Sequence, residues 1–143
     1  MIRTPVWKEV SSVLDASEFG YPVVDLPLSA TTNPEAAVDF LVAELVRSGR
    51  LLPESAQRVA CQVLHRESLG STGVGHGVAL PHTKSNAVGE VLGIVGRSPA
   101  PVAWPFCADQ EPVQVVCLLV VPASEPGTSM RALEAVAQKL KDR

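Results

Sequence analysis

The sequence predicts a single α/β domain, a sandwich in which helices flank a mixed β-sheet. Three stretches repeat apolar residues at helical spacing, and short apolar runs bounded by proline and glycine indicate strands. Residues 112–121 are apolar nearly throughout, as expected of a central strand covered on both faces. A length of 143 residues, 46% of them hydrophobic, suffices for one core. We expect the domain over residues 21–143, preceded by an N-terminal arm, residues 1–20.

Two helices are predicted in the first half of the chain. The first spans about residues 34–48, because Thr32 and Glu35 form a capping box at its start and Gly49 is a natural stop. The second begins after a proline and spans about residues 53–67, with apolar side chains at helical spacing on one face.

Five segments are predicted to be strands from their apolar residues and the prolines and glycines that bound them. Prolines at both ends of the first segment favour a short edge strand. Turns are expected at residues 83–89 and around Pro99 and Pro101, and a third helix over residues 129–141. The strand segments are residues 21–28, 78–80, 91–95, 102–104 and 112–121.

Composition narrows the functional classes. The formal net charge is −3 without a concentrated Lys/Arg patch, which argues against nucleic acid as the main partner. The longest apolar run, residues 115–123, is too short to cross a bilayer, and the N-terminus lacks the apolar core of a signal peptide. Cys61, Cys107 and Cys117 are widely spaced and form no CxxC pair. We therefore expect buried, reduced thiols in a cytoplasmic protein without direct membrane insertion.

Residues 66–84 are the chemically distinctive stretch. Closely spaced glycines allow positive φ and the close approach of a ligand to the main chain. The apolar run at residues 78–80 reads as the end of a buried strand, and Pro81 marks the point where pairing should stop. His82 is therefore expected at a strand end beside a loop rich in N–H groups, where a histidine can meet a phosphate.

His82 is the candidate nucleophile, because a neutral imidazole nitrogen can accept a phosphoryl group near neutral pH. Arg66 could clamp the phosphate oxygens, and the loop could add N–H donors. The structural alternatives are a polar residue after a strand for His82, and a helix-end charge or surface ion pair for Arg66. Spacing alone favours these alternatives. The candidate phosphate-site loop residues are Thr72, Gly73, Gly75 and Gly77.

The other histidines give weaker signals. His76 lies between two glycines and either shares the site as an auxiliary group or is a solvated loop residue. His65, on the second helix, is expected to be structural. A zinc site from these histidines and a cysteine lacks any standard ligand spacing, so we predict no metal and no cofactor. The glycines also match neither a Walker A motif nor GxGxxG, and Cys107 has no adjacent base.

The segment RESLGSTGVGHGVALPH resembles the signature of enzyme IIA domains of the bacterial sugar phosphotransferase system, fructose/mannitol class. The resemblance extends over most of residues 21–140, and a stand-alone domain points to the nitrogen-regulatory IIA-like branch. The matching residues are Arg66, Glu67, Thr72, Gly73, Gly75, Gly77, Ala79, Pro81 and His82.

This resemblance implies the α/β sandwich of the type-2 IIA domains and a phosphoryl-carrier activity. It implies that His82 accepts phosphate from the phosphorylated histidine carrier protein, with Arg66 as the active-site arginine. In transporting members the group passes to a cysteine of a IIB domain. In regulatory members the phosphorylation state controls binding to a target protein. We thus expect a phosphohistidine-dependent phosphotransferase.

One departure opens an alternative. The family usually carries a second active-site histidine at the start of the last helix, where this chain has Ser129. A serine donates a hydrogen bond but carries no positive charge. The loss should weaken transition-state stabilisation by about 2 kcal/mol, or roughly tenfold to hundredfold in rate, unless His76 compensates. The alternative is therefore a regulatory protein-binding module with slow or no phosphotransfer.

Overall fold

The computed structural model describes residues 21–75, 77–105, 112–124, 131, 134–136 and 138. The predicted arm at residues 1–20 lies outside the described residues, as do His76, Cys107 and Ser129. The ends of the predicted third helix lie outside them too. Among the described residues, Arg131, 134–136 and Gln138 are helical.

Six strands of the described part form one mixed sheet. They are β1 (Val23–Asp25), β2 (Gly73–Gly75), β3 (Val78–Ala79), β4 (His82–Ser85), β5 (Leu92–Val102) and β6 (Val113–Pro122). The order is β1-β5-β6-β3-β2, and β4 also pairs with β6. β6 runs antiparallel to β5 and parallel to β3 and β4. The predictions of a central strand and of a proline-bounded edge strand, β1, are confirmed.

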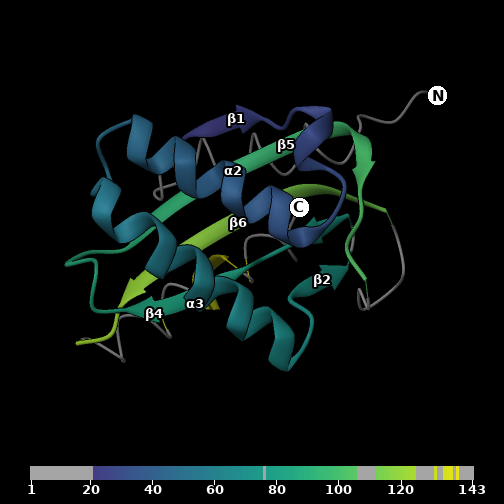
Figure 1. Ribbon diagram of the computed structural model, residues 1–143. Helices are drawn as coiled ribbons and strands as arrows, with labels where there is room; N and C mark the ends of the chain where they lie inside the picture. Colours follow the sequence, from purple (N-terminus) through teal and green to yellow (C-terminus); the bar gives the residue numbers. More distant parts are fainter. Residues whose placement is uncertain are drawn as a thin grey trace.

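Two α-helices of equal length cover one face of this sheet, α2 (Pro34–Arg47) and α3 (Ala56–Leu69) (Figure 1). Short 3-10 turns, η1 (Leu28–Ala30) and η2 (Pro53–Ser55), precede them. The predicted cap of the first helix was wrong: Asn33 Oδ1, not Thr32, accepts the Ala36 N–H at 2.7 Å. Asn33 directly precedes Pro34 in an extended conformation, so it is the N-cap residue and Thr32 lies one residue too early.

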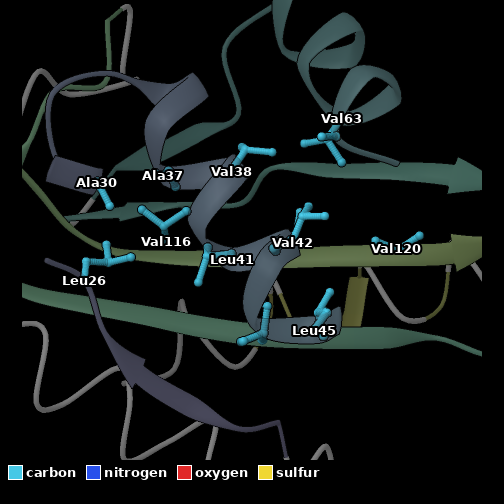
Figure 2. Close-up of a cluster of buried hydrophobic side chains, with 14 of the residues drawn as sticks. Leu26, Ala30, Ala37, Val38, Leu41, Val42, Leu45, Val63, Val116 and Val120 are labelled. Atoms are coloured by element: carbon cyan, nitrogen blue, oxygen red, sulfur yellow. The ribbon is translucent and has the colours of Figure 1, made fainter. Parts of the chain in front are cut away.

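The apolar face of α2 packs on the sheet and forms most of the core on that side. Leu41 and Leu45 have no exposed surface. Figure 2 shows them over the sheet with Val116 and Val120 of β6, while Val63 of α3 enters from the side. Burying one such leucine contributes about 1.5–3 kcal/mol, so this face supplies much of the stability of the fold.

The opposite face of β6 is buried as well. Successive strand residues point to opposite sides, so Val115, Cys117 and Leu119 form a second cluster. Val136, from the helical C-terminal residues, is fully buried in this cluster. Helical residues thus cover both faces of the sheet, which confirms the predicted sandwich. No described helix combines the length and apolarity needed to cross a membrane.

The turn predicted at residues 83–89 was wrong for residues 83–85, which are strand, and correct for Asn86 and Ala87. His82–Ser85 forms β4, with His82 aligned to Leu119 of β6. Pro81 has no N–H, but its carbonyl accepts the Leu119 N–H at 3.0 Å, so the ladder continues through the acceptor side. A proline therefore does not end a strand when only its carbonyl faces the neighbour.

Two further segments, one predicted to be a turn and one a loop, are strand in the structure. β5 continues through Pro99 and Pro101, with a shift in its register against β6 between Arg97 and Val102 that absorbs the prolines. Part of the predicted glycine loop, Gly73–Gly75, forms β2 and pairs with β3.

Candidate functional site

His82 opens β4 and is partly buried beneath α3. Its Nδ1 lies 2.8 Å from the backbone oxygen of Leu80. A carbonyl oxygen only accepts hydrogen bonds, so Nδ1 carries the proton and Nε2 keeps its lone pair. The ring is thus held in the tautomer in which Nε2 is the nucleophilic atom.

The surroundings of His82 lower its pKa below the ordinary value for histidine. Burial of the ring is the main cause, and the positive charge of Arg66 acts in the same direction. The hydrogen bond to Leu80 and the charge of Glu67 act in the opposite direction. The imidazole is therefore mainly neutral at pH 7, which is the form that can attack an electrophile.

Arg66 lies on the last turn of α3, close enough to influence His82 electrostatically. Its Nη1 donates to the carbonyl of Gly70 at 3.0 Å, so it partly serves the helix-end role of the structural alternative. Its other N–H groups bond none of the described residues, so they can still meet an anion on His82.

Glu67 holds the end of α3 to two other segments. Its carboxylate accepts the Thr72 N–H at 3.1 Å and the Trp104 Nε1–H at 3.0 Å, and it also accepts the Thr72 hydroxyl. Trp104 is itself buried. Sequence reasoning gave Glu67 no role of its own. The available signal was its place beside Arg66 in the family motif.

The glycine segment, residues 70–77, contributes more residues to the sheet than the sequence predicted. Gly75 and Gly77 have φ of 91° and 81°, values that disfavour other residues, so the tight connection from β2 to β3 requires them. The Thr72 and Gly73 N–H groups already donate to Glu67 and to Ser71 Oγ. A phosphate would have to displace these bonds, so a phosphate-binding role for this loop stays a prediction.

A groove of about 610 Å³ lies between α3 and β4, and we call it the α3–β4 groove. His82 and Arg66 both line it, whereas no described residue of the glycine segment does. Thr83 and Lys84 of β4 and the buried Val121 of β6 complete its lining. The α3 side chains that line it are Arg58, Cys61, Gln62, His65, Arg66 and Leu69.

Three groove residues correct or extend the sequence predictions. Cys61 is exposed, so the expectation of buried thiols holds for Cys117 and was wrong for Cys61. His65, expected to be structural, is exposed in the groove. Lys84 was not singled out, although a position two residues after His82 on a strand places it on the same face. Among the described residues, no group of three or more His, Cys, Asp or Glu is placed to hold a metal.

Comparison with known proteins adds the family. A family model described as "Phosphoenolpyruvate-dependent sugar phosphotransferase system, EIIA 2" matches residues 23–143. Over 112 residues the chain is 36% identical to the 2-O-alpha-mannosyl-D-glycerate-specific EIIABC component of Escherichia coli K12, covering 78% of this chain but 17% of that protein. Over 121 residues it is 31% identical to a nitrogen regulatory protein of Bradyrhizobium diazoefficiens, covering 85% and 76%.

A solved structure agrees with both matches. The nitrogen regulatory protein IIA-Ntr of Neisseria meningitidis superposes with a TM-score of 0.71 at 29% identity, covering 85% of this chain and 78% of that one. The α/β sandwich predicted from the sequence, and the resemblance to IIA domains with nitrogen-regulatory relatives, are confirmed.

Proposed function

The chain belongs to the EIIA type-2 family of the phosphoenolpyruvate-dependent sugar phosphotransferase system, and we propose that His82 is its phosphoryl acceptor. The observation that carries the proposal is the 2.8 Å contact between His82 Nδ1 and the Leu80 carbonyl, which leaves Nε2 free to attack. The donor would be the phosphorylated histidine carrier protein, as in the family. A cytoplasmic location follows from that partner and stays a prediction.

The proposed step exchanges one P–N bond for another. The Nε2 lone pair of His82 attacks the phosphorus of the carrier's phosphohistidine, and the electron pair of the broken bond returns to the carrier's ring nitrogen. Positive charge then develops on the His82 ring. The Leu80 carbonyl and the Glu67 carboxylate stabilise that charge, because both favour a protonated ring in the resting protein. Arg66 would stabilise the phosphoryl oxygens.

We place the chain in a nitrogen or metabolic regulatory branch, on the strength of its similarity to nitrogen regulatory proteins. The phosphoryl group would then pass to a IIB domain or set the affinity for a regulatory target. His76 as an auxiliary group, Ser129 at the usual second-histidine position, and a domain spanning residues 21–143 remain parts of the same proposal.

The second candidate is a regulatory binding module with slow or absent phosphotransfer. The observation in its favour is Ser129, which cannot supply the positive charge of the usual histidine. Binding of a target protein would then be the same with and without the carrier system. The two candidates share the fold and differ in whether His82 becomes phosphorylated.

The deciding experiment is incubation of the full chain with phosphorylated histidine carrier protein. We expect an acid-labile adduct that mass spectrometry maps to His82 and that His82→Ala abolishes. His65→Ala is the matched control, since it removes the other described groove histidine and should leave the adduct intact. A chain that takes up no phosphate under these conditions would favour the second candidate.

A further inference from the structure

Three cations and no carboxylate are among the described lining residues of the α3–β4 groove. The cations are Arg58, Arg66 and Lys84. The side chains of Arg58 and Lys84 bond or ion-pair with no other described residue, and Arg66 bonds only the Gly70 carbonyl. These cations are therefore available to an external partner.

This charge is local. The chain as a whole carries a formal net charge of −3. On the neighbouring helix, Arg47 is bound to Glu44, and at the sheet edge Arg97 is bound to Asp25. The groove thus differs in sign from the protein as a whole, and such a patch selects partners by charge.

The cations are spread along the groove rather than gathered at one point. On α3, Arg58 and Arg66 are about 12 Å apart along the helix axis, and Leu69 lies about 16 Å from Arg58, at about 1.5 Å per residue. A site for one small anion needs donors that converge on it. A row of separated cations instead suits an elongated acidic segment, about five extended residues long.

Apolar surface accompanies the charge. Leu69, at the end of the groove, is 72% exposed. Leu69 is one of only a few large apolar side chains left exposed in the described part of the chain. A partner that covered Leu69 with an apolar side chain would remove it from water.

We propose that the α3–β4 groove docks an acidic segment of a partner protein, with an apolar anchor against Leu69 and carboxylates on Arg58 and Lys84. The proposal rests on the proposed function in that His82 lines this groove, so a partner exchanging phosphate with it would meet the same surface. Single-stranded nucleic acid also carries a row of negative charges. It is disfavoured because no Phe, Tyr or Trp among the described lining residues offers a stacking surface for bases.

The test is fluorescence anisotropy of the unphosphorylated full chain with labelled ten-residue peptides. One peptide carries a central Leu-Leu pair flanked by Asp and Glu, and its match carries Lys in place of the acids. We expect the acidic peptide to bind, to weaken as salt rises, and to lose about tenfold in affinity in the double variant Arg58→Gln, Lys84→Gln. Arg50→Gln, an exposed arginine outside the groove, is the charge control and should not change binding.

Three results would overturn the docking proposal. They are equal affinity for the two peptides, no effect of the double variant, or tighter binding of a mixed-sequence single-stranded DNA ten-mer. The His82→Ala variant separates this proposal from the proposed function. Peptide binding by the wild-type chain and by His82→Ala, together with no phosphate uptake by the wild-type chain, counts against phosphoryl transfer alone. Phosphate uptake by a chain that binds no acidic peptide counts against docking alone.

Discussion

α2 and α3 have the same length and lie on the same face of the sheet, yet they differ in burial, capping and the pairing of their charges. α2 buries five side chains, has a bonded cap at Asn33, and its Arg47 is neutralised by Glu44. α3 buries three, has no side-chain cap bond, and borders a groove with unpaired cations and an exposed leucine. The difference indicates that α2 contributes mainly to the stability of the fold, while α3 leaves its outer side exposed along the groove.

The largest expected difference between the two helices is in stability. Leu41→Ala on α2 should lower the free energy of unfolding by about 2–5 kcal/mol, because it leaves a cavity in a fully buried site. Leu69→Ala on α3 should change it by no more than about 0.5 kcal/mol, since that side chain is 72% exposed. Urea unfolding of both variants measures the two changes in the free energy of unfolding. Similar losses would mean that Leu69 belongs to the core and not to an open binding surface.

The next difference concerns the arginines of the two helices. Arg66→Gln should slow phosphate uptake roughly tenfold to a hundredfold, because a charge-assisted contact of about 1.5–3 kcal/mol in the transition state is lost. Arg47→Gln removes the same charge from α2, where Glu44 binds it, and should leave uptake unchanged. Single-turnover transfer from the phosphorylated carrier measures both rates. An equal reduction in the two variants would point to a general charge effect rather than to a contact at His82.

The helix caps give a smaller contrast. Asn33→Ala should lower the free energy of unfolding by about 1 kcal/mol, because the Ala36 N–H loses its acceptor. Thr32→Ala is the matched control one residue earlier and should have little effect on this helix end. Thermal unfolding of the two variants distinguishes them. A larger loss of stability in Thr32→Ala than in Asn33→Ala would support the capping box that the sequence predicted.

The smallest expected effect is on the pH dependence of stability. The pKa of His82 is lowered in the folded protein, so below about pH 6.5 the unfolded chain binds the proton more readily. The contribution of His82 to stability should therefore fall as the pH drops from about 6.5 through the folded-state pKa, and stay constant above neutrality. In urea titrations, the free energy of unfolding of His82→Gln should fall less than that of the wild type between about pH 7.5 and 5. An identical slope in variant and wild type would contradict the burial of the ring.

The sequence predicted the fold for physical reasons that act locally. The apolar run of β6 and the helical spacing of α2 depend on neighbours in the chain, and both were correct. The family motif located His82 and Arg66, and the structure places them in one groove. What periodicity could not reveal was the pairing of distant segments. The strand through Pro81 depends on a carbonyl that faces β6, and the path of β5 through two prolines depends on a register shift.

Other site features were missed for the same reason. The bond from Trp104 to Glu67 joins residues far apart in the sequence, so no local pattern predicts it. Thr72 is only five residues from Glu67, but their bond depends on how the chain turns after α3. Lys84 and Arg58 line one groove only because α3 packs beside β4. Spacing on one element shows which side chains share a face, but not what that face meets. The exposed Cys61 was misjudged because its apolar neighbours in sequence point to the other side of α3.

The central claim is that His82 Nε2 accepts a phosphoryl group, and phosphorus–proton correlation NMR of the phosphorylated full chain tests it most directly. The scalar coupling pattern between phosphorus and the ring protons distinguishes attachment at Nε2 from attachment at Nδ1. Because Nδ1 donates to Leu80, we predict a single phosphohistidine species bonded through Nε2 of His82. Attachment at Nδ1, attachment at another residue, or no phosphohistidine after exposure to the phosphorylated carrier would contradict the claim.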